Sequence, residues 1–97
     1  MATYILLTKL SPESLSLDQI ENNSKRWKQA VNEKCPDVKF ISHYALLGNF
    51  DFLDIYEAPD DEVAAKVSMI SLQNGAFHAE SHPAIPYKKF LELAEEI

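Results

Sequence analysis

Residues 46–62 read LLGNFDFLDIYEAPDDE, and this stretch holds three secondary-structure signals in a row. Gly48-Asn49 is typical of the tight turn in a β-hairpin, because both residues tolerate a left-handed backbone. Phe50–Glu57 is rich in aromatic and aliphatic residues, which predicts a strand that returns from this turn. Pro59 is followed by three acidic residues, as is typical of a helix start. The stretch therefore predicts a hairpin that leads directly into a helix.

The residues on either side complete the pattern. Thr3–Lys9 is nearly all apolar and predicts a central strand. Ser16 and Gln19 have the spacing of a capping box, and Pro36 ends the helix that begins there. The apolar stripe expected for this helix is Leu17, Ile20, Trp27, Ala30 and Val31. Val38–Leu47 alternates between apolar and polar residues and predicts the first hairpin strand.

Downstream of the hairpin, the apolar positions Val63, Ala64, Val67 and Ile70 predict a second helix. It ends at Asn74-Gly75, and Ala76–Ser81 is expected to be the fourth strand. Pro86 opens a short last helix with an apolar face of Tyr87, Phe90, Leu91 and Ala94. This order is that of a ferredoxin-like α+β fold, βαββαβ, with a four-stranded antiparallel sheet, both main helices on one face and a C-terminal helix. We expect one domain over residues 1–97.

The composition argues against several classes of protein. The formal net charge of −6 disfavours binding to nucleic acid, which needs clustered Lys and Arg. The single cysteine, Cys35, rules out an internal disulfide and fits a reducing compartment. No apolar run approaches the ~18 residues of a membrane span, and the first residues lack the features of a signal peptide. We expect a cytoplasmic protein that does not bind membranes.

The two faces of the predicted sheet differ in their expected cover. We expect the helices to lie on the more uniformly apolar face, formed by Phe40, Tyr44, Leu46, Leu53 and Ile55. The opposite face would then carry Ile41, His43, Ala45, Leu47, Phe50, Phe52, Asp54 and Tyr56. This second set is too apolar to be left in water. Two copies that pack these faces together would form a dimeric α+β barrel with an internal cavity, so we expect a homodimer or a higher homo-oligomer.

The hairpin register brings two polar residues of this second face together. With a two-residue turn at Gly48-Asn49, His43 lies directly opposite Asp54, within reach of a hydrogen-bonded ion pair. A four-residue turn would instead place His43 opposite Tyr56, and a three-residue turn would remove the pairing.

Such a cluster suits general acid/base chemistry, with His43 as base, Asp54 as its orienting carboxylate and Tyr56 as hydrogen-bond donor. The same three residues, with Phe52 as an apolar wall, are candidate ligand contacts. The alternative is that His43 and Asp54 form a satisfied polar pair in the dimer interface.

The fourth strand carries His78, Glu80 and His82 on one side, and His78 is a further candidate ligand contact. His78 and His82 lie about 13 Å apart along the strand at ~3.3 Å per residue, too far to share one metal ion. No pair of residues has a recognisable ligand spacing, so we expect neither a metal nor a cofactor.

The chain resembles the GYD-domain family over essentially its whole length. The resemblance is carried by MATYILLTKLSPE at residues 1–13, GNFDF at 48–52, and EAPDDE at 57–62 followed by Ala64-Ala65. It implies the dimeric α+β barrel superfamily, which includes cofactor-free monooxygenases, lactone isomerases, haem enzymes and amino-acid-sensing modules of regulators. It transfers no catalytic residue.

The chain departs from this family at several positions. The signature tyrosine is replaced by Phe50, and Asp54 stands where an aliphatic residue is usual. His78, His82 and Pro83 are also unusual. These changes indicate either an altered pocket or an altered interface.

Three functions follow as hypotheses. The first is a non-enzymatic homodimeric module that binds a small ligand in a cavity between the paired sheets, or serves in assembly. The second is a cofactor-independent enzyme, similar to a monooxygenase or isomerase, acting on a small aromatic or lactone-type substrate. The third is a structural subunit that binds another protein through the sheet face or the acidic surface.

Overall fold

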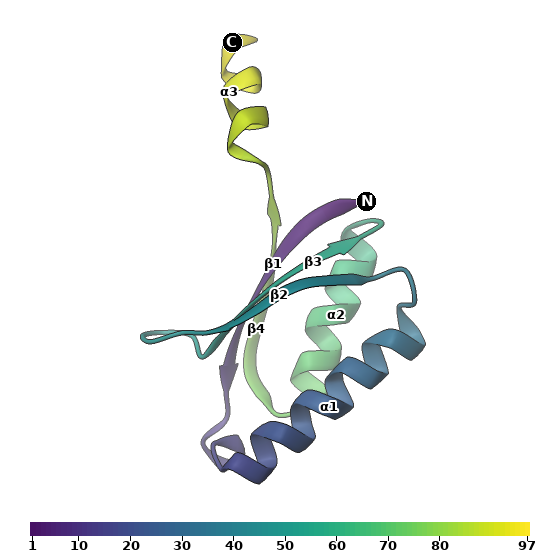
Figure 1. The fold of residues 1–97 in the computed structure, drawn as a ribbon, viewed down its shortest axis with the longest axis vertical. Coiled ribbons are helices and arrows are strands. Elements are labelled where there is room, and N and C mark those ends of the chain that lie inside the picture. The colour runs from purple at the N-terminus through teal and green to yellow at the C-terminus, as the bar shows by residue number, and fades with distance from the viewer.

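The computed structural model describes residues 1–97 and shows the expected ferredoxin-like α+β fold (Figure 1). The strands form one antiparallel sheet in the order β2-β3-β1-β4, with α1 and α2 on one face. No helix is both long and apolar enough to cross a membrane. The elements in chain order are β1 (Ala2–Leu10), a short 3-10 turn (Pro12–Ser14), α1 (Leu17–Lys34), β2 (Lys39–Ala45), β3 (Phe52–Ala58), α2 (Asp61–Gln73), β4 (Ala76–Ala84) and α3 (Tyr87–Glu95).

Both main helices begin where the sequence places their caps. The Ser16 side chain accepts a hydrogen bond from the backbone N–H of Gln19, and Asp60 does the same for Val63. Each cap satisfies one of the N–H groups that a helix start leaves without a partner. The acidic residues in the first turn of α2 also lie at the positive end of its dipole.

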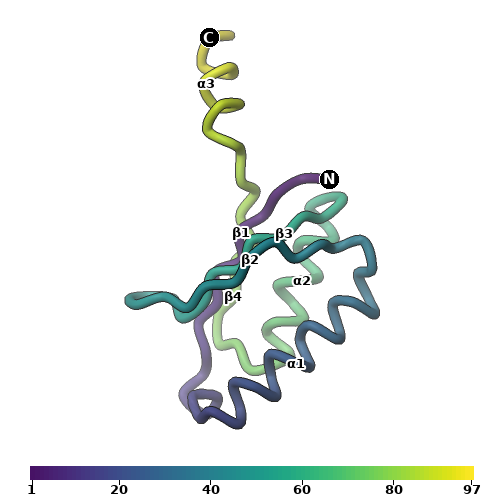
Figure 2. The backbone as a smooth tube through the Cα atoms, viewed as in Figure 1, coloured from purple at the N-terminus to yellow at the C-terminus, as the bar shows by residue number.

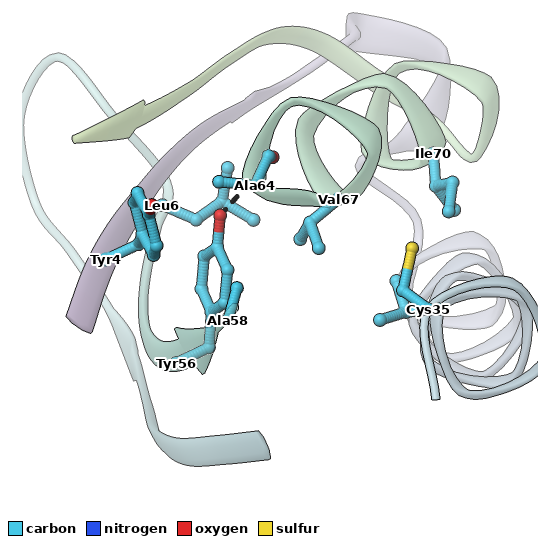
Figure 3. Close-up of a cluster of buried hydrophobic side chains, with 9 residues drawn as sticks. Tyr4, Leu6, Cys35, Tyr56, Ala58, Ala64, Val67 and Ile70 are labelled. Carbon is cyan, nitrogen blue, oxygen red and sulfur yellow. Dashed lines mark hydrogen bonds between the residues drawn. The ribbon is translucent and has the colours of Figure 1, made fainter. Parts of the chain in front are cut away.

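The core lies between the sheet and these two helices (Figure 3). Alternate residues of the central strands, Tyr4 and Leu6 of β1 and Tyr56 of β3, are buried against Val31 of α1 and Val67 of α2. The Tyr4 and Tyr56 rings stack with their centroids 5.6 Å apart. Because side chains alternate along a strand, the residues between these buried ones point to the other face of the sheet.

We call that other face the open face, because no helix lies on it (Figure 1). Its middle is apolar, and its edge on β4 is polar. The open face includes Ile5 and Leu7 of β1, Leu53 and Ile55 of β3, Tyr44 of β2, and His78, Glu80 and His82 of β4.

The expected assignment of the two faces is therefore wrong for most of its members. Tyr44, Leu53 and Ile55 lie on the open face, not beneath the helices. Conversely, the candidate site residues His43, Phe52, Asp54 and Tyr56 lie on the helix side, since Asp54 pairs with buried Leu6, Tyr56 pairs with buried Tyr4, and Phe52 pairs with buried Thr8.

A β-bulge in β2 explains part of this reversal. Phe40 pairs with Tyr56, but Ser42 pairs with Ile55, so Ile41 is an extra residue with no partner. A bulge of this kind shifts every later residue to the opposite face. Phe40 therefore faces the helices as expected, whereas Tyr44, four residues later, faces away from them.

The C-terminal part of the chain extends beyond the compact body (Figure 2). Strand β4 continues to Ala84, three residues past its expected end at Ser81. Its last residues pair with the first residues of β1, Thr3 with Ala84 and Tyr4 with Pro83. A proline is tolerated here because β4 is an edge strand, which bonds on one side only.

Candidate functional site

The hairpin brings His43 and Asp54 together as the sequence predicts. The two residues are directly paired in the β2–β3 ladder, and His43 Nδ1 lies 2.5 Å from Asp54 Oδ1. The ladder ends at Ala45–Phe52, and the turn beyond it is wider than two residues. The pairing register is nevertheless the one that a two-residue turn implies, which excludes the alternatives that placed Tyr56 opposite His43 or removed the pair.

The two members of this pair have different surroundings. Asp54 is buried, whereas the His43 side chain is half exposed and stacks on the Phe52 ring at 5.1 Å between centroids. The end of the hairpin is fixed to β1, because Asp51 accepts the Leu10 N–H at 2.7 Å through its side chain. The His43 imidazole is thus held by the Asp54 carboxylate, to which it is hydrogen-bonded, and by the Phe52 ring, on which it stacks.

Two effects act in opposite directions on the pKa of Asp54. Burial raises the pKa of the Asp54 carboxyl above its ordinary value, and the charge and hydrogen bond of His43 lower it. His43 Nε2 has no hydrogen-bond partner within the protein. A histidine that is fixed through Nδ1 and free at Nε2 is able to exchange a proton, or a hydrogen bond, with a ligand at that atom.

His43 stands between two hollows next to α1. The inner pocket has a volume of about 40 Å³, room for roughly three water molecules. The outer hollow has a volume of about 420 Å³, within the usual range for small-ligand sites. The inner pocket is lined by Leu6, Thr8, Leu10, Ile20, Asn23, Ser24, Trp27, His43, Phe52, Asp54, Ser71, Asn74 and Ala76. The outer hollow is lined by Ser24, Lys25, Lys28, Phe40, Ile41, Ser42 and His43.

Two functional candidates were not expected from the sequence. Lys25 and Lys28 flank His43 across the outer hollow, and neither forms an ion pair within the protein. Lys28 Nζ lies 5.9 Å from the centre of the Phe40 ring. In the sequence, polar Asn23 and Ser24 stand between the apolar positions Ile20 and Trp27 of α1. Ser24 lines the outer hollow together with both lysines, so this polar pair was the available signal.

The structure separates Tyr56 from the pair, although it lies on the same face. Its hydroxyl is 2.7 Å from Ser81 Oγ, which in turn is 2.6 Å from Ser68 Oγ. Burial raises the pKa of Tyr56 to about 12, and the bond to Ser81 opposes that rise. Tyr56 therefore belongs to an internal hydroxyl network between the sheet and α2.

His78 is also separated from His43, because it lies on the open face. Glu80 accepts hydrogen bonds from both neighbours, 2.7 Å from His78 Nε2 and 2.8 Å from His82 Nε2. The hydrogen bond from His78 lowers the pKa of Glu80 most, and the one from His82 lowers it further. No three His, Cys, Asp or Glu side chains are grouped so that they could hold a metal ion.

Comparison with known proteins places this arrangement in a family. The model of the GYD domain matches residues 4–94, and the chain belongs to this family. The glutamine synthetase and cystathionine beta-lyase binding protein of Thermus thermophilus is 28% identical over 88 residues, which cover 89% of this chain and 90% of that protein.

Two solved structures match this chain, and the first is similar to it in fold. That of MtbAldR matches with a TM-score of 0.60 and 16% identity over 88% of this chain, which spans about half (52%) of that protein. That of SCO4226 from Streptomyces coelicolor A3(2) matches with a TM-score of 0.49 and 15% identity, over 86% of this chain and 99% of the other.

The raised pKa of Asp54 gives a testable pH dependence. A group whose pKa is raised by folding stabilises the folded protein most when it is protonated in both states. The contribution of Asp54 to the free energy of unfolding is therefore full below the pKa that Asp54 has in the unfolded chain, and it is lost as pH rises through the pKa of Asp54 in the folded protein. The Asp54→Asn variant lacks this loss, so its stability relative to the parent protein should improve between pH 3 and pH 7. Urea unfolding at several pH values measures the change.

Glu80→Gln is the matched control, because the pKa of Glu80 is shifted in the opposite direction. Its stabilising contribution is present above the unfolded pKa and is lost as pH falls. The stability of this variant relative to the parent should therefore worsen over the same rise in pH. Equal slopes for the two variants would contradict the assignment.

Proposed function

We propose that this protein is a homodimeric binding module that holds a small anionic ligand beside His43. The observation that carries this proposal is the outer hollow, where Lys25, Lys28 and His43 line one space. His43 Nε2 has no hydrogen-bond partner within the protein. Unpaired basic groups gathered in one place are notable in a chain with a net charge of −6. Carboxylate and phosphate groups are the natural partners of such a cluster.

Asp54 fixes His43 through Nδ1, which leaves Nε2 as the atom that can meet an anion. A neutral imidazole that donates through Nδ1 presents only a lone pair at Nε2, which an anion avoids. A protonated imidazole donates from both nitrogens, and the Asp54 carboxylate stabilises that charge.

The homodimer is proposed from the open face. Its apolar centre, including Leu7, Leu53 and Ile55, is only half buried in the single chain. Two copies related by a two-fold axis would cover it with an identical surface. The ligand site would then lie within each subunit and not between the paired sheets, because His43 and Asp54 face α1.

The relative from Thermus suggests what the module serves. Its name states that it binds glutamine synthetase and cystathionine beta-lyase. We propose that the present dimer likewise binds a protein partner in the cytoplasm and that the anion site adjusts this association. The buried free thiol of Cys35 fits a reducing compartment.

The test is a titration of the ¹⁵N-labelled protein with inorganic phosphate and with succinate, followed by NMR. Resonances of α1 and β2 around the outer hollow should shift. His43→Ala and Lys28→Ala should each weaken binding about tenfold, in line with the loss of one charge-assisted hydrogen bond. His82→Ala and Lys89→Ala, which remove the same groups far from the hollow, are the controls.

Two results would count against this proposal. Unchanged binding by His43→Ala would remove the site from this position. Turnover of a small aromatic or lactone substrate that is lost in His43→Ala would instead support the enzymatic alternative, in which His43 is the base.

A further inference from the structure

The inner pocket is lined by buried polar groups that have no partner in the protein. Thr8, Asp54 and Ser71 all line it and are only 6%, 5% and 7% exposed. The Thr8 and Ser71 hydroxyls form no side-chain hydrogen bond, and Asp54 uses only Oδ1, which is bound by His43. No side-chain nitrogen or oxygen is closed off from solvent without a partner. The unpaired oxygens of these three residues therefore reach the pocket itself.

These groups come from three elements of the fold, and the sheet register brings two of them together. Asp54 of β3 pairs with Leu6 of β1, and Thr8 lies two residues further along β1 on the same face. Diagonal neighbours of this kind have Cβ atoms roughly 7–8 Å apart, so one small group between the two side chains can contact both. Ser71 reaches the same pocket from α2, which packs over this face.

The unpaired atoms favour an occupant that donates hydrogen bonds. The second oxygen of the Asp54 carboxylate and the two hydroxyl oxygens all have free lone pairs. Asn74 adds its amide oxygen, because its Nδ2 already donates to the backbone oxygen of Ile70 at 2.8 Å. Burial raises the pKa of Asp54 against the opposing effect of His43, as expected of a carboxylate that lacks solvent. A cationic donor would supply both the charge and the hydrogen bonds.

The remainder of the lining is apolar, which narrows the kind of cation. Its apolar members are Leu6, Leu10, Ile20, Trp27, Phe52 and Ala76. The pocket volume of about 40 Å³ has room for roughly three non-hydrogen atoms. A primary alkylammonium group has donors at one end and an apolar carbon at the other, so it matches both parts of the lining. Ser24 and His43 also line the outer hollow, so the chain of a longer amine can extend there.

We propose that the inner pocket binds the primary ammonium group of a small alkylamine, with its N–H donors directed at Asp54, Thr8 and Ser71. Asp54 then accepts a hydrogen bond from His43 on one oxygen and from the ammonium group on the other. The net charge of −6 favours the approach of a cation. This site is distinct from the anion site proposed at the outer hollow, and neither depends on the other.

The experiment is a titration of the ¹⁵N-labelled protein with methylammonium chloride, followed by NMR. Tetramethylammonium chloride and potassium chloride at the same ionic strength are the controls, because both cations carry the same charge and have no N–H donor. The inference predicts that the amides of Thr8, Asp54 and Ser71 shift to saturation with methylammonium and do not do so with either control.

Variants assign the binding to the inner pocket. Thr8→Val and Ser71→Ala each remove one hydroxyl with little change in shape, and each should weaken methylammonium binding about tenfold, as expected for one hydrogen bond to a charged group. Asp54→Asn should abolish it. Thr3→Val on β1 and Ser68→Ala on α2 remove the same groups outside the pocket and should bind as the parent protein does.

Three results would overturn the inference. Equal shifts with methylammonium and with a control cation would show charge screening or a metal cation in its place. The absence of a saturable shift would show that the pocket holds water only. Binding that is unchanged in both Thr8→Val and Ser71→Ala would place the amine elsewhere. The phosphate titration is a separate measurement, so any of these results would leave the anion site standing.

Discussion

Ile55→Glu should convert the proposed homodimer into a monomer. Ile55 lies in the middle of the open face, beside Ile5 in the sheet register, and lines a groove of about 200 Å³ there. In a two-fold dimer the substitution would bury two unpaired carboxylates, one from each subunit. Burying such a charge without a partner costs several kcal/mol, which weakens association by at least about 100-fold.

Sedimentation equilibrium over a range of concentrations measures this change. The monomer should keep its circular dichroism spectrum, because Ile55 points away from the core between sheet and helices. Leu72→Glu places the same charge on an exposed residue of α2 and should leave the dimer intact. An Ile55→Glu protein with the parent dissociation constant would show that the open face is not the interface.

The second large effect is expected in the core. Tyr56→Ala should lower the free energy of unfolding by about 3–5 kcal/mol, the usual loss for a large buried aromatic residue. Tyr56 is 0% exposed, stacks on Tyr4 and reaches Ser81 with its hydroxyl. A domain of this size typically has only about 5–15 kcal/mol of stability, so the thermal midpoint should fall steeply.

Two further variants divide this loss into its parts. Tyr56→Phe keeps the ring and removes the hydroxyl, and should cost about 1 kcal/mol, because Ser81 retains its bond to Ser68. Phe77→Ala removes an aromatic ring that is 70% exposed and should change stability by less than about 0.5 kcal/mol. A loss in Tyr56→Ala no larger than that in Phe77→Ala would contradict the described core.

The element order and the hairpin register were predictable because their signals are local. The caps place the helices, and the Gly-Asn pair centres the hairpin. The register that opposes His43 to Asp54 was one of three alternatives, and the structure selects it although the turn is wider than the two residues assumed. Which residues point toward the helices and which point to the open face was not predictable in the same way. The bulge at Ile41 reverses the alternation within β2, and nothing in that residue marks it.

The site was predictable only in part, for a related reason. His43, Asp54 and Phe52 are neighbours in the β2–β3 ladder, so a predicted strand register is enough to bring them together. Lys25 and Lys28 come from α1, whose rotation against the sheet depends on how the whole core packs. On β3, hydrophobicity alone favoured Leu53 and Ile55 as the buried set, whereas the core instead takes Tyr56 and Asp54, whose polar groups find partners inside.

The side chains of β3 alternate between the two faces of the sheet, and this links the candidate site to the open face. Asp54 lines the inner pocket, and its two neighbours, Leu53 and Ile55, lie on the open face. The backbone at this point is shared, so we expect a ligand beside His43, which is paired with Asp54, to affect the open face as well. Such coupling is reciprocal by thermodynamic necessity. A ligand that tightens the dimer by a given factor is itself bound more tightly by that factor once the subunits have met.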